Sequence, residues 1–250
     1  MSNDAYMKKV LGEVGLVLKQ YDPVTIVDTI AKNHKNLQTL SVVEQNLLGA
    51  VLGSMLHEAY CNSRRLEKPN ADGLANNPRE KVLTEELDQD FVAEVLSGNV
   101  PQSKTLYIKD GKVCMDIANT SFADLSPHWK KDNFMAGCAA TRSVLTCWDG
   151  LTHNNEAVRE FVTVAVANSI HEAWIARGNV YYDKQGSQVY TNEGLATAYI
   201  NLPQDEKDKD LVHYKMALDM ISTLLEKMHE KNAAESRNEN GVKPAQPGDE

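Results

Sequence analysis

The sequence lacks both a long apolar segment and an excess of positive charge. No window of its 250 residues offers about 18 consecutive apolar side chains, the length that a membrane-spanning helix requires. The chain has 26 Lys and Arg against 35 Asp and Glu, so its net charge at pH 7 is −9. Binding to a nucleic-acid backbone or to an anionic membrane needs clustered cations. We therefore expect neither nucleic acid nor a membrane as a partner.

Cysteine is scarce, and the usual signals of metal binding and export are missing. Cys61, Cys114, Cys138 and Cys147 form no CxxC pair, whereas a zinc site normally takes its ligands from closely spaced pairs. The N-terminal segment also lacks the order of a signal peptide, in which charged residues precede an apolar stretch and then small residues. The sequence therefore predicts a cytoplasmic protein with no metal and no cofactor.

Common catalytic motifs are absent as well. His57 and His171 are each followed by Glu, as at the start of a zincin helix, but neither has the second His four positions later. The sequence has no Walker A loop, no GxGxxG loop and no GxSxG turn. We therefore predict no catalytic residue and no enzyme activity. A general base at His57 or His171 is the weakest alternative, because no nucleophile or metal cluster accompanies either one.

Capping and turn residues predict a mainly α chain, in effect α+β with two small β-hairpins. Asp22-Pro23 and the capping box formed by Ser41 and Glu44 mark two helix starts, and Asp110-Gly111 marks the first hairpin turn. We expect helices over about 4–20, 23–32, 41–63, 84–97, 127–149, 155–177 and 203–232, and hairpins over 105–117 and 180–190. Residues 233–250 show no apolar period, and we expect a disordered tail there.

The helix expected from residue 41 carries two different stripes. One is apolar and is expected in the core: Leu48, Val51, Leu52, Met55 and Ala59. The other contains small residues, Ala50 and Gly53, followed by His57. Small residues leave room either for a neighbouring backbone or for the edge of a ligand. The first interpretation makes His57 a buried imidazole with its hydrogen bonds satisfied.

The order of these elements repeats along the chain. A His-Glu-Ala-aromatic segment occurs at residues 57–60 and again at 171–174, and a hairpin follows each one. Leu125 and Leu202 then lie 77 positions apart, as do Lys130 and Lys207. Since the two histidines are 114 positions apart, the first copy contains about 37 additional residues, which we place within 66–103. Such self-similarity predicts a tandem duplication.

The second copy resembles the repeat (RyR) domain of ryanodine receptors, which also occurs in bacterial and phage proteins. In that pattern an Asn precedes a His-Glu-x-Trp helix, as in residues 168–174. A Tyr-x-x-Leu-x-x-x-Glu-Lys-x-x-Asp segment then opens a later helix, as in residues 199–210. The resemblance implies tandem, pseudo-symmetric RyR-like helical modules over 41–150 and 151–232. The first 40 residues have no counterpart in the family, and we expect an added helical pair over 1–40.

The resemblance also implies a function. RyR-like domains of bacteria and phages are suspected to recognise nucleotide-derived signals such as cyclic nucleotides or ADP-ribose derivatives. A non-enzymatic binder of such a small molecule, acting as a sensor or as a protein that sequesters the signal, is therefore the leading hypothesis. The alternative is a protein-protein interaction or structural protein that uses the modules as a scaffold, including one that forms homo-oligomers.

Thirteen residues are candidates for the ligand site. They offer aromatic faces for stacking, carboxylates for hydroxyl or amine groups, and cations for phosphate. They are His57, Glu58, Tyr60, Arg64, Trp129, Lys130, His171, Glu172, Trp174, Arg177, Tyr182, Tyr199 and Lys207. Each also has a structural interpretation. The aromatic rings suit a core, and the glutamates suit a role in ordering a neighbouring loop through its backbone N–H groups.

Overall fold

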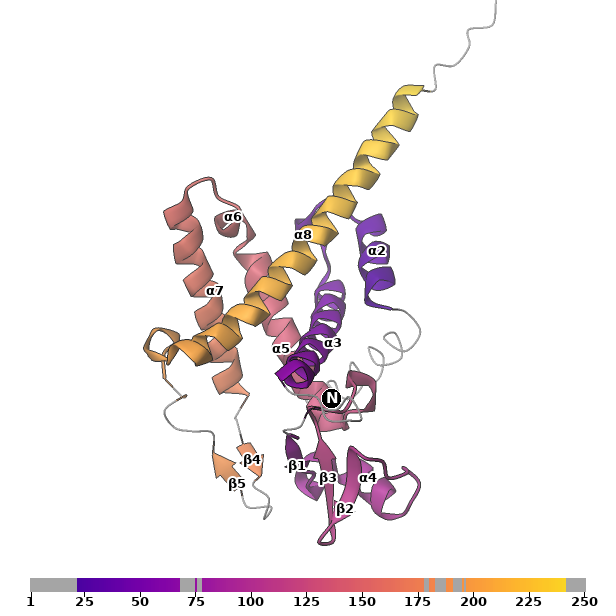
Figure 1. Ribbon diagram of the computed structural model, residues 1–250. Helices are drawn as coiled ribbons and strands as arrows, with labels where there is room; N and C mark the ends of the chain where they lie inside the picture. The colour runs from indigo at the N-terminus through magenta and orange to yellow at the C-terminus, as the bar shows by residue number, and fades with distance from the viewer. Residues whose placement is uncertain are drawn as a thin grey trace, which may run out of the picture.

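Helices make up most of the chain. The computed structural model describes residues 22–67, 75, 78–177, 180–182, 188–190, 195 and 197–241. The helices within these residues are α2 (Pro23–Asn33), α3 (Val42–Glu67), α4 (Glu85–Leu96), α5 (Pro127–Thr146), α6 (Trp148–Leu151), α7 (Glu156–Ala176) and α8 (Gln204–Gly241) (Figure 1). The predicted mainly helical class is therefore confirmed. The helix expected over 4–20 lies outside the described residues.

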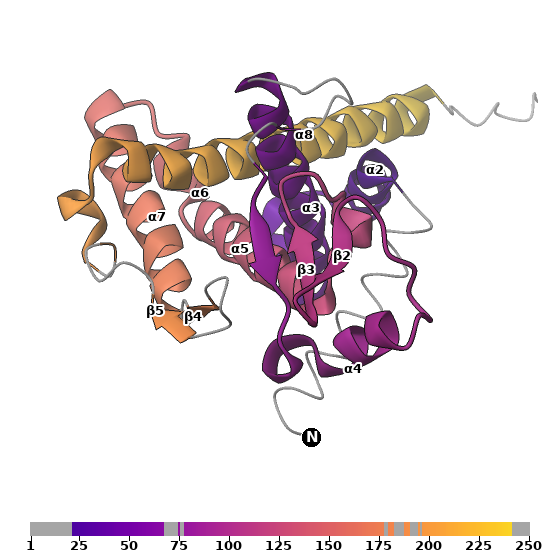
Figure 2. The same cartoon turned by 60° about the horizontal axis from the view of Figure 1, so that its bottom comes forward.

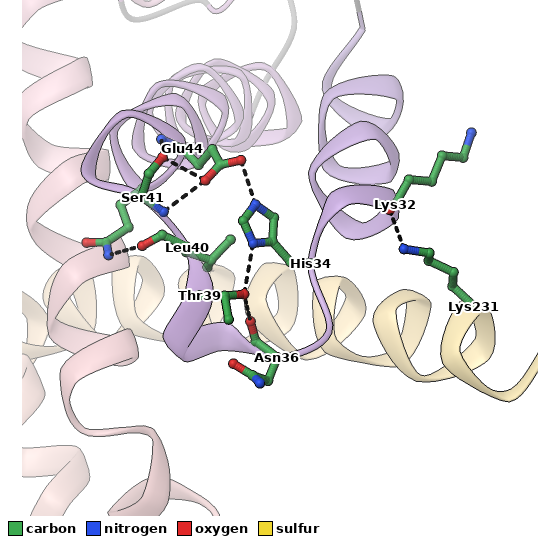
Figure 3. A network of polar contacts seen from close by, with 9 residues as sticks. Lys32, His34, Asn36, Thr39, Leu40, Ser41, Glu44 and Lys231 are labelled. Atoms are coloured by element: carbon green, nitrogen blue, oxygen red, sulfur yellow. Dashed lines mark hydrogen bonds and ion pairs between the residues drawn. The ribbon is translucent and has the colours of Figure 1, made fainter. Parts of the chain in front are cut away.

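Local capping interactions fix the starts of α2 and α3. Asp22 Oδ1 accepts a hydrogen bond from the backbone N–H of Thr25 at 3.0 Å, and Pro23 follows as the first helical residue. Before α3, the Ser41 N–H donates to Glu44 Oε2 at 2.8 Å, and the Glu44 N–H donates to Ser41 Oγ at 3.3 Å. Figure 3 shows that His34 joins this capping box, with its Nε2 2.6 Å from Glu44 Oε1. Both predicted starts are confirmed.

The β structure consists of a three-stranded sheet and a separate hairpin. In the sheet, β2 (Leu106–Lys109) and β3 (Lys112–Asp116) form the predicted hairpin around Asp110 and Gly111, whose φ angles are +52° and +73°. A strand that the sequence analysis missed, β1 (Glu80–Val82), pairs antiparallel with β3 and gives the order β1-β3-β2. The second predicted hairpin is present as β4 (Val180–Tyr182) and β5 (Gln188–Tyr190).

The main core lies between the long helices. Helix α8 runs across α5 and α3 toward α2, as both views show (Figures 1 and 2). An ion pair between Lys227 Nζ and Asp28 Oδ1, at 2.6 Å, accompanies the contact of α8 with α2. Fully buried members of this core are Leu48, Val51, Leu52, Val144, Val166, Ile221, Leu224 and Met228. Met55, which was expected in the core, is 36% exposed and does not belong to it.

A smaller core lies under the three-stranded sheet, at the lower end of the molecule in Figure 1. Helix α4 packs there, and its Asp88 is buried. Asp88 accepts hydrogen bonds from Ser126 Oγ at 2.8 Å and from the His128 N–H at 2.9 Å, and so caps the start of α5 from another helix. Thr84 precedes the first residue of α4, and its side chain makes no capping hydrogen bond.

Two helix ends differ from the sequence expectation. Helix α5 ends at Thr146 and the short α6 follows, instead of one helix continuing to residue 149. Helix α8 continues to Gly241 rather than ending near residue 232. The segment that extends it contains Ala, Glu and Arg, which favour helix even where no apolar face is buried. Residues 242–250 lie outside the described part of the chain.

Helices α3 and α5 cross at nearly the closest distance that two backbones allow. A Cβ atom added to Gly137 of α5 would lie 2.0 Å from the Gly49 carbonyl oxygen and 2.5 Å from the Gly53 nitrogen. A Cβ on Gly53 would lie 2.4 Å from the Asn133 carbonyl oxygen. The small residues of α3 therefore make room for a neighbouring backbone, and the ligand-edge interpretation of this stripe is wrong for Gly53.

Candidate functional site

The first histidine of the repeated pattern is buried and engaged by the protein. His57 on α3 is 4% exposed, and its Nε2 lies 2.8 Å from the carbonyl oxygen of Thr120. Because a carbonyl only accepts, Nε2 carries the proton. Burial lowers the pKa of His57, which keeps the ring neutral near pH 7. The interpretation of His57 as a satisfied core imidazole is confirmed.

The second histidine makes the same kind of contact and one more. His171 on α7 is also 4% exposed, and its Nε2 lies 2.9 Å from the carbonyl oxygen of Thr197 and 3.1 Å from that of Leu195. Its Nδ1 lies 3.2 Å from Oδ2 of Asp210 on α8. His171 therefore contacts backbone carbonyls through one ring nitrogen and a carboxylate through the other.

The surroundings of the two histidines also match. The His57 ring lies 6.3 Å from the Phe122 ring at an interplanar angle of 58°, and the His171 ring lies 6.4 Å from the Tyr199 ring at 59°. These ring partners are 77 positions apart, and so are the two threonine carbonyl acceptors. The residues that contact the two histidines are therefore separated by the same 77 positions as the repeated leucines and lysines.

The two glutamates that follow these histidines behave differently. Glu58 Oε1 accepts a hydrogen bond from the Phe122 N–H at 2.9 Å, so the predicted role in ordering a neighbouring loop is confirmed for Glu58. Glu172 is exposed and accepts from Asn168 Nδ2 at 2.8 Å, one turn earlier on the same helix. Glu172 therefore stabilises its own helix and contacts no neighbouring loop through this bond.

Three candidate residues of the first copy lie elsewhere. Trp129 packs against the sheet core, and Lys81 Nζ lies 5.5 Å from the centre of its ring. Lys130 is in the first turn of α5, where its N–H donates to Ser126 O at 3.0 Å. Arg64 is half-buried in the last turns of α3. None of the three lines either of the cavities described below.

Two candidates of the second copy stabilise a turn. Lys207 Nζ donates to the Ile200 carbonyl oxygen at 2.7 Å and lies 6.0 Å from the centre of the buried Tyr199 ring. The Ile200 carbonyl and the Tyr199 ring both belong to the segment that leads into α8, so these contacts of Lys207 stabilise that segment. Tyr182 lies in β4, and its side chain lies outside the described part of the structure.

A cavity of about 500 Å³ brings the candidates Tyr60, His171 and Trp174 together. We call it the aromatic cavity; its lining residues are Tyr60, Arg79, His171, Trp174, Leu195, Leu202, Glu206, Lys209, Asp210 and His213. Tyr60 and Trp174 come from α3 and α7, each three positions after its histidine, and Trp174 stacks on His171 at 5.6 Å and 17°. The volume is in the range of small-molecule sites.

Burial shifts the pKa of two titratable groups in the aromatic cavity. Burial raises the pKa of Asp210 to about 6, although the nearby His171 and Arg177 oppose this shift. Burial, followed by the charge of Arg177, lowers the pKa of His213 to about 4. Lys209 Nζ contacts Glu206 Oε1 at 2.6 Å and keeps an exposed side chain. The cavity thus offers hydrogen-bond donors, hydrogen-bond acceptors and a cation at its edge.

The sequence analysis missed several residues of the aromatic cavity. Arg79 precedes β1 within a stretch that reads as loop, and nothing in its local sequence indicates a site. Lys209 and Asp210 lie in the segment 199–210 of the RyR-like pattern, which was only a weak indication that they belong to a site. His213 falls one turn beyond that segment on α8. Tertiary structure, rather than spacing along the chain, assembles these groups with Tyr60 and Trp174.

A second cavity of about 540 Å³ lies between α3, α5 and α7. We call it the α5 groove; its lining residues are Val42, Asn46, Phe134, Met135, Cys138, Ala139, Arg142, Ser143, Ser169, Ala173 and Arg177. Of the thirteen candidates, it contains Arg177, whose Nε lies 3.2 Å from Asp132 Oδ1. Arg177 therefore lies apart from the residues that line the aromatic cavity, although its charge acts on Asp210 and His213 there.

No group of three or more His, Cys, Asp or Glu side chains suited to a metal ion occurs among the described residues. None of the described helices is both long and apolar enough to cross a membrane. Comparison with known proteins finds no match among protein-family models, curated proteins or solved structures.

Proposed function

We propose that the chain is a non-enzymatic binder of a nucleotide-derived small molecule, and that the aromatic cavity is its site. The observation that carries the proposal is that Tyr60 and Trp174 line the same cavity as the cations Arg79 and Lys209. Flat rings suit stacking on a base, which contributes about 1–3 kcal/mol per base. Guanidinium and ammonium groups suit phosphate. A sensor or a signal-sequestering protein has to bind its ligand but does not have to convert it.

The same proposal includes two RyR-like modules. Its support is the match between the two histidine sites, in which a backbone carbonyl and an aromatic ring both keep the spacing of 77 positions. Each site lies on a helix that precedes a hairpin, a 3-10 turn and a Pro-initiated long helix. In this proposal the aromatic cavity takes one aromatic residue from each module, Tyr60 from the first and Trp174 from the second.

A binding role also accounts for the state of the histidines. Both Nε2 atoms are within hydrogen-bonding distance of backbone carbonyls, and the remaining nitrogen of His171 faces Asp210. A general base needs a free nitrogen directed at a substrate. The carboxylates of Asp210 and Glu206 instead suit acceptance of a hydrogen bond from a ribose hydroxyl or an exocyclic amine.

Replacement of Trp174 tests this function directly. We expect the Trp174→Leu variant to bind the ligand about tenfold more weakly than the wild type, or worse, because the stacking surface is lost. The measurement is a thermal-shift screen with linear and cyclic nucleotides, NAD and ADP-ribose derivatives, followed by calorimetric titration of each hit.

Phe161→Leu is the matched control, since Phe161 is on the same helix, is 76% exposed and lies outside the cavity. It should bind as the wild type does. The proposal is wrong if none of these compounds stabilises the wild type, or if Trp174→Leu binds with unchanged affinity.

A second candidate function, protein-protein interaction, is favoured by the exposed apolar residues of α7. Phe161 is 76% exposed and Val164, three positions later on the same helix, is 49% exposed. If this face associates with a second copy, sedimentation velocity should show a concentration-dependent dimer that Phe161→Ser abolishes. A monomer at all concentrations for both proteins would exclude self-association through this face.

A further inference from the structure

The α5 groove has an unusual charge for this chain. The protein carries a net charge of −9, yet two arginines and no carboxylate line a cavity of about 540 Å³. Arg142 is exposed, and its Nη2 donates to Asn46 Oδ1. A guanidinium has five N–H donors, so this bond leaves most of them for a ligand. The groove is therefore suited to an anion.

The ends of the groove differ from each other. Ser143 Oγ of α5 lies 3.1 Å from Ser169 Oγ of α7, whereas Asp132 of α5 contacts Arg177 of α7, so the two helices run antiparallel. At 1.5 Å per residue, Arg142 and Asp132 are about 15 Å apart along α5. Arg177 is already neutralised by Asp132 and its side chain is 14% exposed. Arg142, at the other end, donates to the amide oxygen of Asn46 and not to a carboxylate, so its charge is available to an anion.

Apolar side chains cover the length between the two ends. Phe134 and Ala139 of α5 and Ala173 of α7 line this part of the groove. The thiol of Cys138 is buried there, and burial raises its pKa to about 11, so it stays neutral at pH 7. A neutral, apolar floor next to a cationic end matches a molecule that has one anionic head and an apolar chain.

We propose that the α5 groove binds a small amphipathic oxyanion, with its carboxylate or phosphate head at Arg142 and its apolar chain over Ala139, Phe134 and Ala173. The serine pair, Ser143 and Ser169, supplies hydroxyl donors beside the head. Trp174 does not line this groove, so the inference is independent of nucleotide binding in the aromatic cavity.

The test is calorimetric titration of the full chain with octanoate and octyl phosphate, each kept below its micelle concentration. We expect at least one of them to bind saturably, and the comparison of the two identifies the preferred head. Octanol and octyltrimethylammonium, which lack the anion, should bind at least about tenfold more weakly, because hydrogen bonds to a charged head are lost.

Two variants test the location of the binding, and two others serve as controls. Arg142→Gln should weaken it about tenfold, and Ala139→Leu, which fills the floor, should abolish it. Arg237→Gln is the matched control, since it removes the same charge from the exposed far part of α8 and should bind as the wild type does. Trp174→Leu should also bind the oxyanion normally.

The proposal is overturned by no binding of either anion, by equal binding of octanol, or by unchanged binding in Ala139→Leu. Arg142 is exposed, so Arg142→Gln is expected to fold, and unchanged affinity in that variant also overturns it.

Discussion

The Gly137→Ala variant is expected to lose about 3 kcal/mol of unfolding free energy, near the upper end of overpacking effects. The added methyl group would lie 2.0 Å from the Gly49 carbonyl oxygen, and a backbone atom cannot rotate away as a side chain can. Helices α3 and α5 must therefore move apart, which opens the main core around Leu48 and Val144. The higher helix propensity of Ala, about 1 kcal/mol, offsets only part of this loss. Urea denaturation followed by circular dichroism measures the change.

Gly150→Ala provides the control for this prediction. The three atoms nearest to a Cβ at Gly150 all belong to the side chain of Val162, the closest at 2.8 Å, and a side chain can adjust. We expect a change smaller than about 1 kcal/mol there. If Gly137→Ala denatures at the same urea concentration and with the same slope as the wild type, the close crossing of α3 and α5 is wrong.

Replacing His213 with Gln is expected to make the protein relatively more stable in acid. Burial lowers the pKa of His213 to about 4, whereas the unfolded chain takes up this proton near pH 6.5. Between these values the unfolded state binds more protons than the folded state, so wild-type stability falls as the pH decreases. His213→Gln removes this contribution, which we expect to be about 2 kcal/mol at pH 4.5.

Asp210 acts in the opposite direction over a similar range. Because burial raises its folded pKa to about 6, the folded state binds its proton before the unfolded state does, and stability increases as the pH falls through 6. Asp210→Asn should therefore increase the loss of stability on acidification, whereas His213→Gln should reduce that loss. Urea titrations at pH 4.5, 5.5 and 7 measure both variants.

The control is His229→Gln, since His229 is exposed on the same helix. Its pH dependence should equal that of the wild type. An equal pH dependence for His213→Gln would show that the pKa of His213 is not lowered in the folded protein.

Features set by neighbouring residues were predictable from the sequence. The cap at Asp22, the capping box of Ser41 and Glu44, and the turn at Asp110-Gly111 all depend on contacts within a few positions, and all three are confirmed. The sequence also placed His57 and His171 in a repeated pattern, and in the structure each of them contacts a threonine carbonyl oxygen.

Features set by distant residues were not predictable in this way. Strand β1 has three residues, too few for an alternating pattern, and forms because β3 offers it a partner more than thirty positions away. Asp88 caps α5 across 38 positions and replaces a local cap. Arg79 reaches the aromatic cavity only because the chain entering β1 passes there. Contacts between residues that are far apart in the sequence produce no regular spacing from which they could be predicted.

The contact between α2 and α8 has a consequence for synthesis of the protein. Lys231 Nζ donates to the Lys32 carbonyl oxygen, 199 positions earlier (Figure 3). Ile26 and Ile30 share one apolar cluster with Leu224 of α8. At about 5–20 residues per second, a ribosome completes α2 roughly 10–40 s before α8. For that interval the apolar face of α2 lacks its partner α8, so we expect α2 to complete its packing only after α8 has been synthesised.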